Sequence, residues 1–429
     1  MTATASEPVS ARTFWADLPR PGRWLLATTT ASTIGRGMTL PFTVIYLHEV
    51  RGVSLAVSGV LMGVIALVAL IVTGPVGVLT DRFGARRMLL WGNTCQSVGA
   101  LLIGFGTTVP VLGLGLALLG ASFGIGWPAF NALISAVVSG AVRTQFFGIN
   151  FALLNLGIGI GGVLGGLLAD VTRAWTFTVL FLVDALCGLI PIGLLLGPLR
   201  HVHGRAQVPA DADEGHPSSY LRIIRQPAMA WMTTLTFVGS LVGYGQMEAG
   251  FPAFARQVSE VSTRTVGFAF AINTVVIVGT QFLVLRWIVG RRRTRVFLVL
   301  IGLWAGAWAL LWVTVAVPGT LLAAILVCAF HVLFGVGETM LNPTLPAIVN
   351  DLAPAHLRGR YNAASALAFQ LGAIAAPVSA GVLLGRGWAG GFIGLLLGGL
   401  ALMVLLALAL ERRITPVVNG VEPVEPISR

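Results

Sequence analysis

The sequence consists largely of apolar stretches, each long enough to cross a lipid bilayer. A transmembrane helix needs about 20 predominantly apolar residues, and stretches of this length follow one another from about residue 24 to residue 410. Hydrophobic residues make up 56% of the 429-residue chain and charged residues only 10%, which is more apolar than a soluble globular domain sustains. We therefore expect an all-α integral membrane protein.

Twelve candidate spans are separated by polar turns. The first six are expected near 24–47, 54–79, 88–107, 110–138, 146–169 and 174–197. The second six are expected near 228–255, 265–289, 296–316, 319–349, 361–385 and 388–410. The chain is thus predicted to form an N-terminal tail, a six-helix bundle, a polar central linker, a second six-helix bundle and a C-terminal tail, over 1–23, 24–197, 198–227, 228–410 and 411–429.

The basic residues indicate the orientation of these spans. All 27 are arginine, and most lie in the tails and in loops on one side of the predicted membrane. Such loops usually face the cytoplasm, so both termini are predicted to be cytoplasmic in a multi-pass protein of the cytoplasmic (inner) membrane. The positive-inside rule explains the net charge of +11 without nucleic-acid binding, and we expect a monomer.

An internal repeat supports the division into two halves. A shift of 215 residues (358 minus 143) places Arg143 on Arg358 and Gly157 on Gly372. The fourth and fifth spans therefore match the tenth and eleventh, as expected for a duplicated transporter.

The short loop from Gly77 to Arg87 concentrates charge between the second and third spans. It reads Gly-x-x-x-Asp-Arg-x-Gly-x-Arg-Arg, with motif residues Gly77, Asp81, Arg82, Gly84, Arg86 and Arg87. With twelve spans and a central linker, this motif resembles the signature of the major facilitator superfamily. The resemblance implies two pseudo-symmetric six-helix bundles. It also implies that these residues form a conformational latch, in which the aspartate meets the start of the eleventh helix, here near Arg358 to Asn362.

Two further resemblances point to a subgroup of that family. The glycines of the fifth span resemble the antiporter motif of drug and proton exchangers, and they are Gly157, Gly161, Gly162, Gly165 and Gly166. Glu248 and Glu338 lie in the seventh and tenth spans, where proton-driven multidrug exporters of the family carry acids. The resemblance implies a role in proton coupling for both residues.

Ionisable side chains at bilayer depth are costly, by about 2.5–3.5 kcal/mol on insertion scales, and are candidates for function. In the first half, Arg36 belongs to a polar stripe that predicts a cavity-facing or helix-facing surface, together with Thr29, Ser32, Thr39 and Thr43. Asp184 is the only mid-membrane anion predicted in this half, so we expect an Arg36–Asp184 pair. The sequence leaves open whether this pair is a structural clamp or serves substrate or proton binding.

In the second half, the acids are the proton-coupling candidates. Glu248 lies four residues after Tyr244 and Glu338 seven residues after His331, so each pair shares one face of a regular helix. Histidine can exchange a proton near neutral pH, although packing is an alternative role for His331, as hydrogen bonding within the half is for Glu248. The proton-coupling candidates are Glu248, Glu338, His331 and Asp184, and the substrate-cavity candidates are Arg36, Tyr244, Gln246, Asn150, Asn155 and Asn273.

These observations predict a transporter rather than an enzyme. The sequence contains no lysine, so it cannot form the Gly-x-x-x-x-Gly-Lys loop that binds ATP, and neither a metal nor a cofactor is expected. We expect a proton-coupled antiporter that exports amphipathic, drug-like molecules by alternating access. The alternatives are a proton symporter that imports a small nutrient, such as a sugar or peptide, and a membrane sensor that does not transport. The expected partners are a small-molecule substrate, protons and the lipid bilayer.

Overall fold

A computed structural model describes residues 14–15, 17–138, 140–202, 223–288, 290–354 and 358–421. Within these ranges the chain forms helices and connecting turns, and no strand. This confirms the predicted all-α fold class. The predicted linker and tails fall partly outside the described ranges, over 203–222, 1–13 and 422–429.

The helices of the first half correspond closely to the apolar stretches. They are α2 (Arg20–Thr39), α3 (Thr43–Ile45), η1 (Tyr46–Val50), α4 (Leu55–Phe83), α5 (Ala85–Phe105), α6 (Val109–Val137), α7 (Gly140–Leu168) and α8 (Ala174–Leu196). Those of the second half are α10 (Pro227–Gly239), η2 (Ser240–Tyr244), α11 (Gly245–Met247), α12 (Gly250–Gln257), α13 (Thr263–Ile288), α14 (Arg293–Val313), η3 (Thr314–Ala316), α15 (Leu321–Leu352), α16 (Arg358–Gly385) and α17 (Ala389–Glu411).

Ten helices in the described part of the chain have the length and apolar composition needed to cross a membrane. The first and seventh predicted spans are not among them. Both are interrupted, and α2, although 20 residues long, is rich in arginine, threonine and glycine. The first is broken by a turn at 40–42 and continues as the π-helical turn η1, while the seventh contains the π-helical turn η2 and a second break at 248–249. The count of twelve spans therefore stays a prediction.

The contacts divide the chain into two compact units. The first contains Met1–Leu40 and Leu67–Ala212, and the second contains Pro41–Ala66 and Asp213–Arg429. This division differs from the predicted bundle boundaries at Pro41–Ala66. Within the second unit, Glu49 of this segment forms an ion pair with Arg256 of α12, with 2.6 Å between Oε2 and Nη2.

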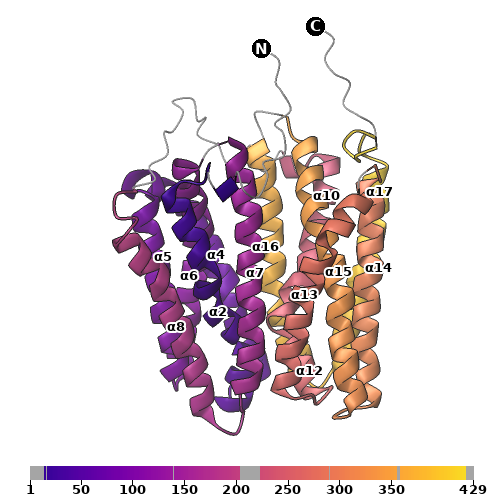
Figure 1. Ribbon diagram of the computed structural model, residues 1–429. Helices are drawn as coiled ribbons and strands as arrows, with labels where there is room; N and C mark the ends of the chain where they lie inside the picture. The colour runs from indigo at the N-terminus through magenta and orange to yellow at the C-terminus, as the bar shows by residue number, and fades with distance from the viewer. Residues whose placement is uncertain are drawn as a thin grey trace. The chain divides into compact units, whose positions relative to one another are not determined.

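Each unit has its own core. In the first, α2 packs against α7 and α8, and α5 packs against α6 and α8 (Figure 1). In the second, α15 contacts α13 and α14, while α10 contacts α16 and α17. Aromatic rings fill much of the second core: Trp304 and Trp308 have no exposed surface, and the Trp304 ring stacks on Phe334 at 4.7 Å between centroids. These tryptophans therefore serve packing between helices.

Two short turns require glycine. Gly84 between α4 and α5 has φ 86°, and Gly290 between α13 and α14 has φ 72°. Side chains other than glycine rarely adopt this left-handed conformation. Both turns therefore place a glycine in the left-handed region shortly before the helix that follows.

The described part of the C-terminal tail folds back onto the second unit. Asn419 is 4% exposed, its backbone carbonyl accepts from the Arg293 N–H at 2.9 Å, and its side-chain oxygen accepts from the Thr294 N–H at 3.0 Å. The side chain of Asn419 thus accepts from a backbone N–H in the first turn of α14 that has no partner within the helix. The position of Asn419 in a polar tail did not indicate this role.

Candidate functional site

Small residues bring α2 close to α7 in the first unit. A Cβ atom on Gly157 would lie 2.5 Å from the carbonyl oxygen of Thr30, and one on Gly161 would lie 2.8 Å from Cα of Gly37. Cβ atoms in proteins essentially never lie this close to a neighbouring atom. Only glycine at these two positions therefore permits α2 and α7 to approach so closely. These two glycines of the predicted antiporter motif therefore position the polar helix α2. The other three, Gly162, Gly165 and Gly166, are buried on the same helix.

Asp184 lies buried beside α2, with 2% of its surface exposed. Its carboxylate accepts from Thr39 Oγ1 at 3.0 Å and from Gln96 Nε2 at 3.2 Å, and the charge of Arg36 interacts with it electrostatically. The structure thus brings Arg36 and Asp184 into one network. A Cβ on Gly35 would meet Cα of Asp184 at 2.4 Å, so glycine on α2 is again what allows the approach.

A cavity of about 500 Å³ lies within the first unit, between α2, α5, α6, α7 and α8. Thr29, Ser32 and Arg36 line it from α2, and Asn150 lines it from α7. Asn150 Oδ1 accepts from the Thr29 hydroxyl at 2.9 Å. Two of the predicted cavity residues, Arg36 and Asn150, therefore share one cavity.

Phe123, Trp127 and Phe130 line the cavity from α6. The Arg36 guanidinium carbon lies 3.6 Å from the centroid of the Phe123 ring, close enough for a cation–π interaction. Sequence reasoning missed these aromatic residues, and also Asn93 and Gln96 of α5. The three-residue spacing of those two amides in an apolar stretch was a signal that could have revealed them.

Glu338 is the centre of a second polar cluster, within the second unit. Its Oε1 accepts from the Tyr244 hydroxyl at 2.6 Å, and its Oε2 accepts from Asn273 Nδ2 at 3.2 Å. A Cβ on Gly335 would lie 2.7 Å from Asn273 Oδ1, and one on Gly337 would lie 2.7 Å from the Trp304 indole. Glycines on the same helix therefore make room for the groups around Glu338.

Tyr244 thus binds the acid of α15, although the sequence suggested Glu248 as its partner. The expectation assumed a regular helix. Residues 240–244 form a π-helical turn, and Glu248 lies half-buried at the break between α11 and α12. The four-residue spacing therefore no longer describes one continuous helix face.

Gln246 also differs from its predicted place at a cavity wall. It has no exposed surface, and its Nε2 donates to the Leu241 carbonyl at 2.8 Å and the Ala376 carbonyl at 3.3 Å. Gln246 therefore ties the interrupted span to α16. Asn155 is half-buried, donates to the Phe151 carbonyl of its own helix at 2.8 Å, and is not among the residues lining the cavity.

His331 lies in an aromatic environment. It has no exposed surface, and its ring centroid lies 4.3 Å from that of Phe251, 4.9 Å from Phe270 and 5.1 Å from Phe330. Glu338, on the same helix, instead takes its hydrogen bonds from Tyr244 and Asn273. This placement suits the packing role that the sequence left open for His331.

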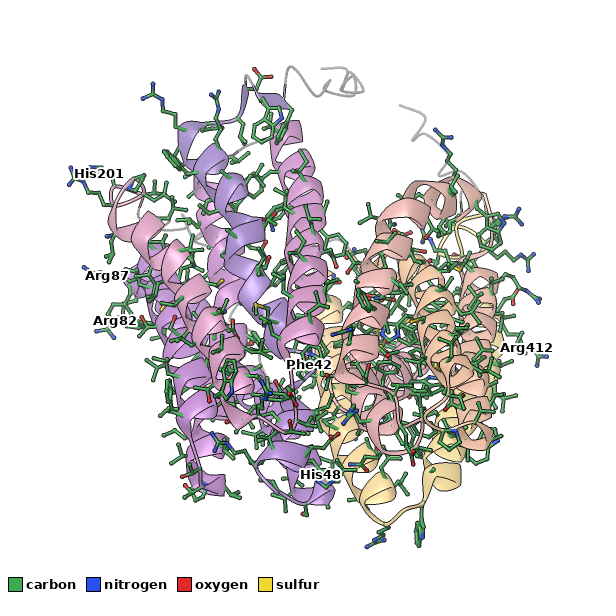
Figure 2. The ribbon with its side chains drawn as sticks, turned by 60° about the horizontal axis from the view of Figure 1, so that its bottom comes forward. Phe42, His48, Arg82, Arg87, His201 and Arg412 are labelled. Atoms are coloured by element: carbon green, nitrogen blue, oxygen red, sulfur yellow. The ribbon has the colours of Figure 1, made fainter. Side chains whose placement is uncertain are left out.

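The predicted latch is described in part. Arg86 Nε donates to the Leu195 carbonyl at 2.8 Å, which joins the start of α5 to the end of α8. Arg82 and Arg87 are exposed and point away from the surrounding helices (Figure 2). The backbones of Gly77 and Asp81 belong to α4, but the Asp81 side chain and the Gly77 surroundings lie outside what the structure describes, as does the Arg358 side chain.

The chain is similar to several transporters. It is 26% identical over 378 residues to the uncharacterized MFS-type transporter YdeE of Escherichia coli strain K12, which covers 84% of this chain and 88% of that protein. It is 24% identical over 371 residues to a Na⁺, Li⁺, K⁺/H⁺ antiporter of Planococcus maritimus, covering 80% and 84%. It is 27% identical over 221 residues to multidrug resistance protein 1 of Bacillus subtilis strain 168, covering 52% and 54%.

Solved structures share the fold. The crystal structure of a POT family transporter in complex with 5-aminolevulinic acid superposes with a TM-score of 0.75 at 14% identity, over 93% of this chain and 97% of that one. The sequence profile of the Major Facilitator Superfamily matches residues 25–377. The helical fold, the membrane-depth polar clusters and this match agree, and the chain belongs to the Major Facilitator Superfamily of membrane transporters.

Proposed function

We propose that this protein is a proton-coupled antiporter that exports amphipathic small molecules, with Glu338 as its proton-carrying group. The observation that carries the proposal is the pair of neutral partners, Tyr244 and Asn273, at the Glu338 carboxylate. Among the described residues the structure gives Glu338 no ion pair. Such an acid can bind and release a proton without breaking a salt bridge.

Asn273 is suited to hold Glu338 in both protonation states. Its Nδ2 donates to the carboxylate, while its Oδ1 is buried without a hydrogen-bond partner. A protonated carboxyl group has a hydrogen to donate. Rotation of the Asn273 amide by half a turn brings Oδ1 to accept that hydrogen, so one side chain satisfies either state of the acid.

The cavity of the first unit supplies a place for the substrate. Its volume of about 500 Å³ falls within the range of about 300–1,000 Å³ that is common for small-molecule sites. One wall carries hydroxyl, amide and guanidinium groups, and another carries aromatic rings. This combination suits a molecule with one polar and one apolar side.

The energy available from protons is sufficient for export. Each pH unit across the membrane is worth about 1.4 kcal/mol per proton, and each charge moved gains about 2.3 kcal/mol per 100 mV. Two of the similar proteins support this direction, since one is named a cation/proton antiporter and another a multidrug resistance protein. The Asp81 latch and the cytoplasmic termini belong to the same proposal.

Everted membrane vesicles test the proposal. Respiration acidifies their lumen, so an exporter that exchanges substrate for protons raises lumenal pH when a substrate is added outside. We would add three naphthalene probes that differ in charge: naphthalene-sulfonate, naphthalene-sulfonamide and trimethyl(naphthylmethyl)ammonium. At least one should raise lumenal pH with the native protein, and none should do so with Glu338→Gln.

Glu260→Gln is the matched control, because Glu260 is an exposed acid of the same unit and its replacement should leave the response intact. Further acidification of the lumen on addition of a probe would indicate a proton symporter. A response that survives Glu338→Gln would remove this residue from proton coupling. The absence of a response to all three probes, with the protein shown to be present and folded, would contradict export of amphipathic molecules.

A further inference from the structure

The α5 wall of the cavity in the first unit carries two amide side chains. Asn93 and Gln96 lie three residues apart, so they share one helix face, and both line the cavity. Asn93 Nδ2 donates to the Leu89 carbonyl at 2.7 Å, and Gln96 Nε2 donates to Asp184 Oδ1 at 3.2 Å. Each amide therefore uses its donor end inside the protein.

These hydrogen bonds fix which end of each amide is left for a ligand. A backbone carbonyl and a carboxylate can only accept, so the NH₂ group of the amide, and not its oxygen, must lie against them. Within the described part of the chain, neither Asn93 Oδ1 nor Gln96 Oε1 accepts a hydrogen bond. The α5 wall therefore presents two acceptors whose identity is fixed by their surroundings.

Hydroxyl groups of the α2 wall are also committed as donors. A hydroxyl group carries one hydrogen, and here that hydrogen is directed to backbone carbonyls of the same helix. Thr28 Oγ1 donates to the Trp24 carbonyl at 3.0 Å, while Ser32 Oγ and Thr33 Oγ1 each donate to the Thr29 carbonyl at 2.9 Å. All three hydroxyl groups line the cavity. Their oxygens can offer a bound molecule only lone pairs.

The other features of the lining favour an uncharged aromatic molecule. Arg36 is already engaged, because its charge acts on the buried Asp184 and its guanidinium carbon lies 3.6 Å from the centroid of the Phe123 ring. Together, Arg36 and Asp184 add no net charge to the site. Beside the two amides, a Cβ on Gly92 would lie 3.1 Å from Ile125 Cγ2, so α5 packs closely on α6, the helix that supplies the aromatic wall.

We propose that this cavity selects uncharged aromatic molecules that carry two or more hydrogen-bond donors on one edge, such as hydroxyl groups. The donors bind Asn93 Oδ1 and Gln96 Oε1, which belong to side chains that begin about 5–6 Å apart. The ring packs against Phe123 and Trp127 of α6, which line the same cavity. A molecule with acceptors alone would leave both amide oxygens unpaired, and an unpaired polar group in a closed site weakens binding.

This inference names the substrate class of the proposed exporter, and it rests on the proposed function only where it treats the bound molecule as cargo. Exchange of an uncharged molecule for one proton moves a single positive charge inward. Both the pH difference and the membrane potential would therefore drive export of such a molecule.

Equilibrium binding to the purified protein, without any gradient, tests the inference. The probes are 1,3-dihydroxynaphthalene, which has two donors on one ring, and 1,3-dimethoxynaphthalene, which has none. Both are uncharged at mildly acidic pH. Because one neutral hydrogen bond changes affinity by about twofold to tenfold, the native protein should bind the dihydroxy probe at least about tenfold more tightly.

Three variants locate the effect. Asn93→Leu keeps a similar side-chain shape but removes the acceptor, and should reduce the preference for the dihydroxy probe by at least about threefold. Gln96→Leu should do the same. Thr94→Val is the matched control, because Thr94 is exposed on the same helix and is not among the residues lining the cavity. This control should leave the preference unchanged.

The two acceptor variants differ in their risk to folding. Gln96→Leu removes a donor from the buried Asp184, whereas the Asn93 amide donates only within its own helix. Asn93→Leu therefore keeps the site testable if Gln96→Leu does not fold.

Equal affinities of the native protein for the two probes would overturn the inference, as would a preference that survives in folded Asn93→Leu. If the dihydroxy probe is preferred as expected but raises no lumenal pH in everted vesicles, the binding site stands and its role in antiport fails. If the dimethoxy probe binds equally well and raises lumenal pH, the antiport proposal stands and the donor-selective site fails.

Discussion

The two units share the same close packing between corresponding helices, but the buried acids that they hold, Asp184 and Glu338, have different partners. In the first, a Cβ on Gly157 of α7 would lie 2.5 Å from the Thr30 carbonyl oxygen of α2. In the second, a Cβ on Gly372 of α16 would lie 2.5 Å from the Phe237 carbonyl oxygen of α10. These glycines are the ones related by the internal repeat. The duplicated halves thus keep the close contact between corresponding helices.

The polar clusters on this common scaffold differ. Asp184 of the first unit is buried and accepts from Thr39 and Gln96, with the charge of Arg36 nearby. Glu338 of the second unit accepts its hydrogen bonds from two neutral side chains, Tyr244 and Asn273. A carboxylate tied to a cation is costly to neutralise, whereas one with neutral partners can change its protonation state. The comparison is consistent with the proposal that Glu338 exchanges protons, whereas Asp184 balances the charge of Arg36.

The largest expected difference in stability is between Asp184→Asn and Glu338→Gln. Asp184→Asn leaves Arg36 without its nearby anion, and we expect a loss of about 3 kcal/mol in unfolding free energy. Glu338→Gln should cost less than about 1 kcal/mol, because the new amide can accept from Tyr244 and donate to the unpartnered Oδ1 of Asn273. Thermal unfolding of the two purified variants in one detergent measures the difference.

A double variant sharpens this test. Arg36→Gln combined with Asp184→Asn removes both charges, so part of the stability lost in Asp184→Asn should return. Equal losses for Asp184→Asn and Glu338→Gln would show that the two clusters do not differ in the way proposed.

The shared packing predicts equal effects of Gly157→Ala and Gly372→Ala. Each added methyl group overlaps a backbone carbonyl of the neighbouring helix, and overpacking of this kind costs about 1–3 kcal/mol. Gly148→Ala and Gly279→Ala are the matched controls, since a Cβ at either position meets nothing within 4 Å. These controls should be neutral or slightly stabilising, because alanine favours a helix over glycine. A large loss of stability in one unit alone would contradict the structural equivalence of the two halves.

Ion pairs in the two units should contribute differently. The side chains of Arg256 and Glu49 in the second unit are 17% and 21% exposed, while those of Arg173 and Asp170 in the first are 66% and 43% exposed. Water and salt screen the exposed pair more strongly. Double-mutant cycles on thermal stability should give about 1 kcal/mol for Arg256–Glu49 and close to zero for Arg173–Asp170. Equal coupling energies for the two ion pairs would contradict the expectation that solvent exposure weakens the Arg173–Asp170 pair.

The smallest expected effect concerns Asp170, in the turn between α7 and α8. The hydroxyl and backbone N–H of Thr172 donate to this carboxylate and hold the pKa of Asp170 below its ordinary value. A carboxyl group whose pKa is lower in the folded state stabilises the fold at pH values above its pKa in the unfolded state. This stabilisation is lost as the pH falls through the pKa of the folded state. At neutral pH the native protein should therefore melt at a slightly higher temperature than Asp170→Ala. This difference in melting temperature should shrink as the pH falls below about 4.

The turn at the corresponding place in the second unit provides the comparison. Position 172 shifted by 215 is Gly387, which turns the chain with φ 73° rather than through a carboxylate. Gly387→Ala should therefore lower the melting temperature without a dependence on acid pH. A pH-independent effect of Asp170→Ala would remove the carboxylate from the explanation.

Much of the fold could be predicted from local sequence. Apolar stretches located the helices to within a few residues at most positions, because a long run of apolar residues has few arrangements other than a helix in a bilayer. The first and seventh spans were harder. Their π-helical turns, Tyr46–Val50 and Ser240–Tyr244, have no distinctive composition and are stabilised by contacts such as those of Gln246 with Leu241 and Ala376.

The candidate sites show the same limit. The sequence picked out Arg36, Asp184, Asn150, Asn273 and Glu338 because polar groups at bilayer depth are rare. It did not identify which of them meet. Tyr244 was expected to bind an acid four residues away but donates to one 94 residues away, and the aromatic wall of α6 looked like any apolar helix.

The sequence by itself therefore determined the helical membrane architecture, the family and the small set of ionisable groups in the membrane, because these depend on composition, motif and spacing along one chain. Only the tertiary structure decided that Arg36 faces a cavity with an aromatic wall while Asp184 lies behind it, and that Tyr244 and Asn273 hold Glu338. Those contacts join different helices, and they depend on how closely glycines let the helices approach and on where a helix is broken.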